Sequence, residues 1–390
     1  MTNFTSRMDR VQSPIIPIVG QLIKDNPGTI SLGQGVVYYS PPPEVIEGIS
    51  QFLNQPNNNQ YKSVQGINSL IEQIIRKLQE DNHTNINSTR SIMVTAGANM
   101  AFMNAILAIT HAGDEIILNT PYYFNHEMAI TMANCHPILV NTDDNYQLSL
   151  DNIKAAITPK TRAIVTISPN NPTGVVYSES SIKEVNQLCR EKGIYHISDE
   201  AYEYFIYDGI KHFSPASIID SDDYTISLYS LSKAYGFASW RIGYMVVPNH
   251  LLQPVKKIQD TILICPPVIA QYAALNALKV GKKYCENHLQ EINQVRKIFI
   301  QYIQEINDIC TLVPSEGGFY FFLRIHTEMN DFELVKKLIE NYKIAVLPGS
   351  TFGMKKGCYL RIAYGALQQE TATKGIERLV QGLKHLINTV

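Results

Sequence analysis

Short apolar runs alternate with helical segments through the middle of the chain, and this alternation constrains the fold most strongly. Several runs are continuously apolar, as expected of strands that are buried on both faces of a sheet. We predict strands at 92–95, 115–118, 137–140, 163–167, 194–198, 225–228 and 243–247. Predicted helices between them include 99–110, 148–156 and 178–192. This order predicts an α/β domain with a mostly parallel seven-stranded sheet between helices.

The C-terminal part has a different pattern. Residues 251–306 are mainly helical, with a break at Pro266-Pro267 and a long run from Val268. The segments predicted beyond them are strands at 311–313, 318–324, 344–347 and 359–363, alternating with helices at 331–340 and 367–387. This predicts a smaller α+β domain, which we expect to include the N-terminal arm because chain termini often lie close together. The predicted domains are therefore 41–280, and 1–40 together with 281–390.

The composition excludes several classes of protein. The chain has 390 residues, of which 45% are hydrophobic and 17% charged, and its formal net charge is −2. These values predict a soluble globular protein with neither nucleic acid nor a membrane as partner. No stretch approaches the roughly 20 apolar residues of a membrane span, and the N-terminus lacks the apolar run of a signal peptide. The six cysteines form no C-x-x-C pair, which favours free thiols in the cytoplasm over disulfides or a metal site.

Polar and aromatic residues directly follow five of the predicted strands. Ligands of α/β proteins bind at the carboxyl ends of the strands, so we expect these residues to lie around one site. The segment 96–99 opens a helix, and its free N–H groups could bind a phosphate. The other groups are Tyr122-Tyr123, the segment 168–174, Asp199 with Tyr202, and Ser230 with Lys233.

The segment 228–244 places Lys233 among small, hydroxylic and aromatic residues. Burial would lower the pKa of this lysine, and a neutral amine can form a Schiff base with an aldehyde. Ser230 and Arg241 could hold a phosphate on the same molecule. An aldehyde together with a phosphate describes pyridoxal phosphate. The alternative is a surface lysine beside an ordinary loop serine, and this segment alone does not decide between the two.

Three motifs in order along nearly the whole chain carry a family resemblance. They are N-N-P-T-G at 170–174, D-E-A-Y at 199–202, and S-x-x-K at 230–233 with the distal Arg241. Together they resemble the class I and II aminotransferases, which are fold type I enzymes dependent on pyridoxal phosphate. The resemblance implies transfer of an amino group between an L-amino acid and a 2-oxo acid by a ping-pong mechanism. It also implies a homodimer with shared active sites.

The resemblance implies a role for each residue at the cofactor. Lys233 is similar to the Schiff-base lysine that also carries the proton, and Asp199 to the carboxylate that pairs with the pyridine nitrogen. Asp199 could alternatively serve as a helix N-cap. Tyr202 and Asn171 are similar to the groups that bind the 3′-oxygen of the ring, and Tyr123 to the aromatic residue that stacks on it. The implied phosphate site consists of Gly97, Ala98, Asn99, Ser230 and Arg241, with Tyr61 reaching in from a partner subunit.

Two further residues are expected at the substrate. Arg361 is similar to the arginine that binds the α-carboxylate as a bidentate pair, and the backbone of Gly35 would approach the same group. A solvated strand arginine is the alternative for Arg361. Apolar residues alternate around it, which favours an inward-facing charge.

Local strings favour aromatic or methionine-like substrates. The strings at 33–37, 95–99, 121–125 and 202–205, the last with Asp208-Gly209, are similar to those of plant-type aromatic aminotransferases. Asn99 stands where some aspartate-specific relatives have a lysine, and 255–264 lacks an arginine that another subgroup has there. Tyr38, Tyr39 and Phe352 could form an apolar side-chain pocket, although core packing is the commoner fate of such residues.

Other functions remain open from the sequence. One is an aspartate or broad-range aminotransferase, and another is a lyase, decarboxylase or cyclase on the same scaffold. A ligand-sensing regulatory module is less favoured, since no DNA-binding extension is expected. A nicotinamide dehydrogenase would need a fuller glycine fingerprint than Gly33-Gln34-Gly35 and would leave Lys233 without a role.

Overall fold

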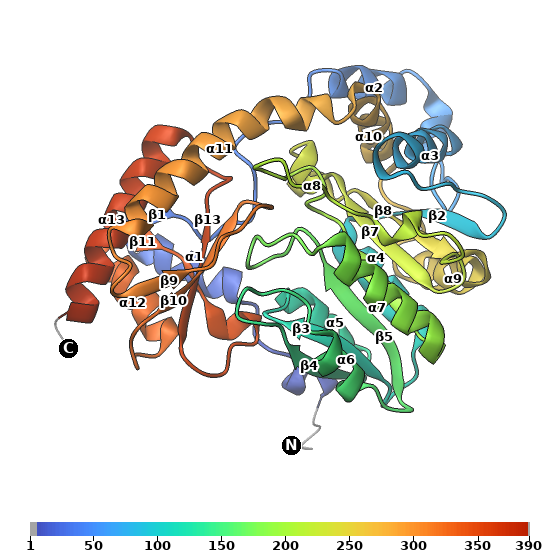
Figure 1. Ribbon diagram of the computed structural model, residues 1–390. Helices are drawn as coiled ribbons and strands as arrows, with labels where there is room; N and C mark the ends of the chain where they lie inside the picture. Colours follow the sequence, from blue (N-terminus) through green and yellow to red (C-terminus); the bar gives the residue numbers. More distant parts are fainter. Residues whose placement is uncertain (1–5, 389–390) are drawn as a thin grey trace, which may run out of the picture.

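The computed structural model describes residues 6–388 and contains a central seven-stranded sheet (Figure 1). Its strands are β2 (Arg90–Thr95), β3 (Glu115–Thr120), β4 (His136–Asn141), β5 (Thr161–Ile167), β6 (Tyr195–Asp199), β7 (Thr225–Ser230) and β8 (Gly243–Pro248). They lie in the order β2-β8-β7-β6-β5-β3-β4. Only β8 runs antiparallel to its neighbours among these strands. Every predicted strand is present, and the predicted fold class is confirmed.

Helices cover both faces of this sheet, because alternate residues of each strand point to opposite faces. Ile116 and Leu118 of β3 pack with α4 (Ala98–Ile109), α5 (Phe124–Met132) and α9 (Leu252–Ile262). Ile117 between them packs with α6 (Leu150–Ala156) and α7 (Glu179–Lys192) on the other face. Strands that are apolar on both faces therefore occupy the middle of the protein. The helix α3 (Asn68–Asn82) and the short helix α8 (Leu231–Ala234) complete this part.

A second group of elements lies beside the first (Figure 1). Its four-stranded antiparallel sheet has the order β12-β13-β10-β9. The strands are β9 (Cys310–Leu312), β10 (Tyr320–Ile325), β12 (Leu347–Pro348) and β13 (Cys358–Ala363), and the helices are α1 (Ile15–Asp25), α12 (Asp331–Tyr342) and α13 (Gln369–Asn388). The N-terminal strand β1 (Ile30–Ser31) pairs with β11 (Ile344–Ala345). The N-terminal segment is thus joined to the C-terminal part of the chain.

The domain boundaries at residues 40 and 280 stay a prediction. Residues 1–5 and 389–390, which belong to the predicted smaller domain, lie outside the described residues. Short 3-10 helices lie at Arg7–Arg10, Pro56–Asn59, Pro215–Ser217, Ala238–Trp240, Asn249–Leu251 and Gly349–Phe352. Between residues 6 and 388, no helix is both long enough and apolar enough to cross a membrane.

The helical pattern differs from the prediction at two places. The long run expected from Val268 is two helices, α10 (Val268–Val280) and α11 (Lys283–Gln304). Gly281 separates them with φ +77°, a conformation that glycine adopts at little cost and that ends a helix. The helix α5 was not predicted, because its buried residues are spread around it and give no one-sided apolar stripe. The helix α2 (Val45–Leu53) packs against α10.

The sheet register aligns the strand ends that carry the predicted functional residues. Ile167 at the end of β5 lies opposite Asp199 at the end of β6, and Asp199 lies opposite Leu228 near the end of β7. The segments that follow these three strands therefore leave the sheet at the same edge. Close packing of glycines supports this edge, since a Cβ at Gly243 would lie 2.6 Å from the carbonyl oxygen of Tyr229.

Candidate active site

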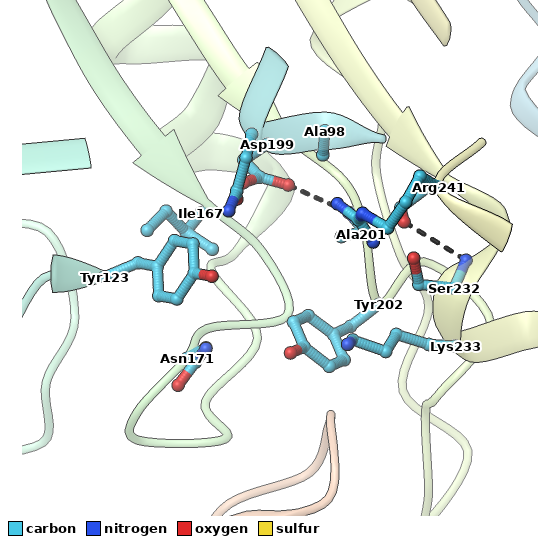
Figure 2. A pocket seen from close by; sticks show the side chains of 12 residues that line it. Ala98, Tyr123, Ile167, Asn171, Asp199, Ala201, Tyr202, Ser232, Lys233 and Arg241 are labelled. Atoms are coloured by element: carbon cyan, nitrogen blue, oxygen red, sulfur yellow. Dashed lines mark hydrogen bonds between the residues drawn. The ribbon is translucent and has the colours of Figure 1, made fainter. Parts of the chain in front are cut away.

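A cavity of about 130 Å³ opens at the carboxyl ends of the central strands (Figure 2). The residues that line it come from the start of α4, from the ends of β5 and β6, and from the segment after β7. They are Ala98, Asn99, Tyr123, Ile167, Asn171, Asp199, Ala201, Tyr202, Ser230, Ser232, Lys233 and Arg241. Residues that are up to 143 positions apart in the sequence (98 to 241) thus meet around one space.

Lys233 lies on α8, directly after β7. The hydroxyl of Ser230 caps this short helix by accepting a hydrogen bond from the amide of Ser232 at 3.2 Å. The Nζ of Lys233 donates to the carbonyl oxygen of Gly35 at 2.7 Å. Burial lowers the pKa of Lys233 to about 8, the charges of Arg241 and Arg361 act in the same direction, and Asp199 opposes them. The amine is still mostly protonated at neutral pH, but its neutral, nucleophilic fraction is far larger than that of an exposed lysine.

Asp199 is held in place on both of its carboxylate oxygens. Oδ1 accepts a hydrogen bond from the amide of Ala201 at 3.1 Å, which is the turn role considered as the alternative for this residue. Oδ2 lies 3.1 Å from Nε2 of His126, which is buried on α5 and stacks on Phe102 with a centroid distance of 3.9 Å. A buried carboxylate needs such partners to stay charged. Asp199 thus presents a fixed negative charge at the cavity.

His126 belongs to no sequence motif, and we did not predict its role. A usable signal existed, because His126 follows Tyr123 by three residues and would share its helix face. The two rings meet edge to face at a centroid distance of 5.3 Å. Three cavity residues, Ile167, Ala201 and Ser232, were also not predicted. Two of them are apolar and fill the walls, while Ser232 adds a hydroxyl beside Ser230.

Arg361 on β13 is buried, with an exposed fraction of 2%, and is not a solvated strand arginine. Its Nη1 donates to Oδ1 of Asn171 at 3.0 Å, and its Nη2 donates to the carbonyl oxygen of Gly33. Its Nε has no hydrogen-bond partner within residues 6–388. A guanidinium has five N–H donors, so several remain for a ligand. The unused donors of a buried guanidinium suit a carboxylate.

A group of hydrogen-bond donors that could hold an anion lies where Gly97 meets Arg241. Gly97 has φ +80° at the start of α4, and a Cβ there would lie 2.7 Å from Nη2 of Arg241. The Nη1 of Arg241 donates to the carbonyl oxygen of Ala238 at 2.8 Å, which orients the guanidinium. The first amides of α4, at Ala98 and Asn99, and the hydroxyls of Ser230 and Ser232 complete the donors. A helix N-terminus beside a guanidinium is suited to a phosphate.

The remaining predicted residues take three kinds of position. Tyr123 lines the cavity, and its hydroxyl accepts a hydrogen bond from Asn125 at 2.7 Å. Gly35, Gly97 and Arg361 are not among the lining residues but adjoin Lys233, Arg241 and Asn171, which are. Tyr61 is 83% exposed and is not among the lining residues of its own chain.

The three candidates for an apolar side-chain pocket do not line the cavity. Phe352 is fully buried and packs edge to face on Phe124 and Phe322. Tyr39 stacks on His288 at a centroid distance of 4.1 Å, and its hydroxyl donates to the backbone oxygen of Lys233 at 2.9 Å. Tyr38 packs edge to face against Tyr39. Core packing accounts for these residues in the single chain.

Comparison with known proteins gives a consistent family. The model of the family aminotransferase class I and II matches residues 27–379. An aromatic aminotransferase of Arabidopsis thaliana is 29% identical and covers 96% of this chain and 95% of its own. A probable aspartate/prephenate aminotransferase of Aquifex aeolicus is 34% identical and covers 92% and 91%. The structure of an aromatic aminotransferase from Pyrococcus horikoshii OT3 superposes with a TM-score of 0.87 at 31% identity and covers 95% and 99%.

The lowered pKa of Lys233 predicts a pH-dependent cost to stability. Below its folded-state pKa of about 8 the lysine is charged in both states, and the folded state bears the desolvation cost. Between about pH 8 and pH 10.5 only the unfolded state binds the proton, so stability rises with pH. In protein freed of bound small molecules, Lys233→Met should therefore raise the melting temperature at about pH 7, and this gain should vanish near about pH 10.5.

The matched control is Lys297→Met, which removes an exposed lysine of α11. Thermal unfolding of both variants beside the unchanged protein supplies the comparison. A stabilisation by Lys233→Met that is equal at both pH values would contradict the lowered pKa.

Proposed function

The chain belongs to the class I and II aminotransferases and has their fold type I architecture, and we propose that it uses pyridoxal phosphate to act on aromatic or methionine-like L-amino acids. The amino group would pass to a 2-oxo acid by a ping-pong mechanism. The observation that carries this proposal is the meeting of Lys233, Asp199 and the Gly97–Arg241 anion site around one cavity. The free thiols of all six cysteines support a location in the cytoplasm.

The residues at the cavity fit pyridoxal phosphate. Its phosphate matches the donors at Gly97 and Arg241, where any side chain at position 97 would fill the space. Its pyridine nitrogen matches the fixed carboxylate of Asp199. When bound, the cofactor supplies an aldehyde that condenses with an amine and a ring that withdraws electrons from it. Lys233 offers that amine, and Tyr123 offers an aromatic face.

The side chains of the protein divide the remaining work. Lys233 can accept and release a proton at Nζ, because its pKa of about 8 lies close to neutral pH. The carbonyl oxygen of Gly35 holds this amine when it is not otherwise bound. Arg361 binds the substrate carboxylate, and Asn171 fixes the orientation of the guanidinium. The carboxylate of Asp199 would keep a proton on the pyridine nitrogen of the cofactor. His126 stabilises this carboxylate through its Nε2.

Charge at the cavity supports a substrate without a second carboxylate. The cations among its lining residues are Lys233 and Arg241, and the roles above commit one to the amine chemistry and the other to the phosphate. Asn99 lies at the exposed rim and carries no charge. A distal carboxylate would thus lack a cationic partner from this chain, which is costly in an enclosed site. The first alternative is an aspartate or broad-range aminotransferase, since the chain is similar both to an aromatic aminotransferase and to a probable aspartate/prephenate aminotransferase. The second is a lyase or cyclase on the same scaffold.

A half-reaction tests the proposed substrate class. The purified protein with its cofactor is mixed with one amino acid and no 2-oxo acid, and absorbance follows the transfer of the amino group. Phenylalanine and methionine should convert the cofactor to its amino form, and aspartate should change it little. The Lys233→Ala variant should show no conversion. Rapid conversion by aspartate would contradict the aromatic preference, and binding without conversion by any amino acid would favour a lyase or cyclase.

The role of Arg361 predicts a selective loss. Arg361→Leu should lower kcat/KM on the order of 10²–10³-fold, because the substrate carboxylate loses a buried charged partner. The affinity for the cofactor should stay unchanged, as measured by equilibrium titration. The matched control is Arg324→Leu. Arg324 is exposed and lies on the neighbouring strand β10, two positions beyond Phe322, which pairs with Arg361, so its loss should change neither quantity. A loss of cofactor affinity in Arg361→Leu would contradict the assignment.

We further propose that a second copy completes the phosphate site. Arg241 and Asn99 are exposed in the single chain, so the anion site is open on one side. Apolar side chains of α2 and α9 are exposed as well, with Ile46 at 68%, Leu53 at 66% and Ile262 at 55%. Exposed apolar groups of this kind mark interaction surfaces. In a symmetric dimer, Tyr61 of each chain would reach the phosphate site of the other.

Shared sites predict complementation between two inactive variants. Subunits with Lys233→Ala and subunits with Tyr61→Ala are mixed and allowed to exchange. About half of the dimers become mixed, each with one intact site of two, so activity should approach about a quarter of the unchanged protein. Activity no greater than the average of the separate variants would contradict a shared site.

A further inference from the structure

Two buried tyrosine hydroxyls meet behind the cavity. Tyr320, the first residue of β10, is fully buried, and its hydroxyl lies 2.7 Å from that of Tyr202. Tyr202 lines the cavity, whereas Tyr320 lies behind it and does not. The pair joins the segment after β6 to the sheet that carries Arg361. Neither the sequence motifs nor the proposed roles account for Tyr320.

The Tyr202 and Tyr320 hydroxyls carry one more proton than their shared hydrogen bond can use. Two hydroxyls have two protons, and only one can lie between the two oxygens. Within residues 6–388, neither hydroxyl makes another hydrogen bond. A buried O–H without an acceptor is costly. Of the two tyrosines, only Tyr202 faces the cavity. If Tyr320 donates to Tyr202, the Tyr202 proton is free to find an acceptor in the cavity, and neither O–H is left without one.

Burial keeps both hydroxyls protonated. Burial raises the pKa of both tyrosines, and that of Tyr320 reaches about 12. Their mutual hydrogen bond raises the pKa of Tyr202 further but lowers that of Tyr320. Arg361, whose guanidinium carbon lies 4.6 Å from the centre of the Tyr320 ring, also lowers the pKa of Tyr320. Arg361 lowers the pKa of Tyr202 as well, so the direction of donation rests on the position of Tyr202 at the cavity.

The surroundings fix the Tyr320 ring in this position. One face lies against the guanidinium of Arg361. A Cβ at Gly35 would lie 2.4 Å from the Tyr320 hydroxyl, so only glycine leaves room for it. Gly35 also holds Nζ of Lys233 through its carbonyl oxygen. Tyr320 thus contacts the residues proposed to bind the cofactor, the substrate carboxylate and the lysine.

We propose that Tyr320 is a positioning residue whose hydroxyl donates to Tyr202 and directs the Tyr202 proton toward the 3′-oxygen of pyridoxal phosphate. This role rests on the proposed function. A hydroxyl that accepts a hydrogen bond is a stronger donor in its turn. Tyr320 would therefore strengthen the bond from Tyr202 to the cofactor without touching the cofactor itself.

The pH dependence of the cofactor absorbance tests this role. A donor at the 3′-oxygen stabilises the unprotonated form of the nitrogen that links Lys233 to the cofactor, so loss of the donor raises the midpoint of the titration. Tyr202→Phe should raise it strongly. Tyr320→Phe keeps the ring over Arg361 and should raise it by about half a pH unit, since only the cooperative part is lost. Tyr364→Phe, at a buried hydroxyl just after β13, is the matched control and should not move it.

A double-mutant cycle separates positioning from a general structural effect. If Tyr320 acts through Tyr202, Tyr320→Phe should cause no further shift in protein that already has Tyr202→Phe. An equal shift in both backgrounds, or no shift in either, would overturn the role of Tyr320. If Tyr320→Phe fails to fold, 3-fluorotyrosine at position 320 serves instead. Its more acidic hydroxyl should lower the midpoint, and an unchanged or raised midpoint would overturn the inference.

These measurements distinguish a failure of the proposed function from a failure of the role of Tyr320. If the unchanged protein binds no pyridoxal phosphate and has no visible band, the proposed function fails. If the band is present and titrates but ignores Tyr320, only the role of Tyr320 fails.

Discussion

The enclosure of one amine at the end of β7 is the constraint on which the rest of the site depends. A lysine loses hydration when protein surrounds it, and the two arginines beside Lys233 add repulsion, so its pKa falls to about 8. The same arginines are useful for the opposite reason, because each can bind an anion. A cofactor phosphate bound to Arg241 and a substrate carboxylate bound to Arg361 would reduce the repulsion between these arginines and Lys233. The site is therefore least favourable electrostatically without the ligands that the proposed function requires.

Two separate sheets must come together for this arrangement to form. The central sheet supplies Asp199 and Lys233 from adjacent strand ends, while Arg361 comes from the four-stranded sheet. The contact between Arg361 and Asn171 joins the two, and so does the contact between Tyr320 and Tyr202. The segment Gly33–Gly35 contacts both parts, since its carbonyl oxygens accept hydrogen bonds from Arg361 and Lys233. Glycine is needed at position 35 because the Tyr320 hydroxyl occupies the space where a side chain would lie.

The sequence predicted the parts of the fold that local patterns encode. All seven central strands were found because they are short, largely apolar runs that alternate with helical segments, and the strand-end motifs led to Lys233, Asp199 and Asn171. The break at Gly281 was missed because helix-compatible residues precede and follow this single glycine, and no proline marks the end of α10. Neither His126 nor Tyr320 belongs to a motif. Their positions follow from packing between segments that are distant in the sequence, namely α5 against β6 and β10 against the segment after β6.

The most direct test of the central claim is to find where the cofactor is attached. Purified protein is treated with borohydride, which makes the linkage permanent, and its peptides are examined by mass spectrometry. The account predicts a phosphopyridoxyl group on the peptide that contains Lys233, and on no other peptide. Attachment at a different lysine, such as the buried Lys77, or the absence of any attached cofactor after incubation with pyridoxal phosphate, would contradict it.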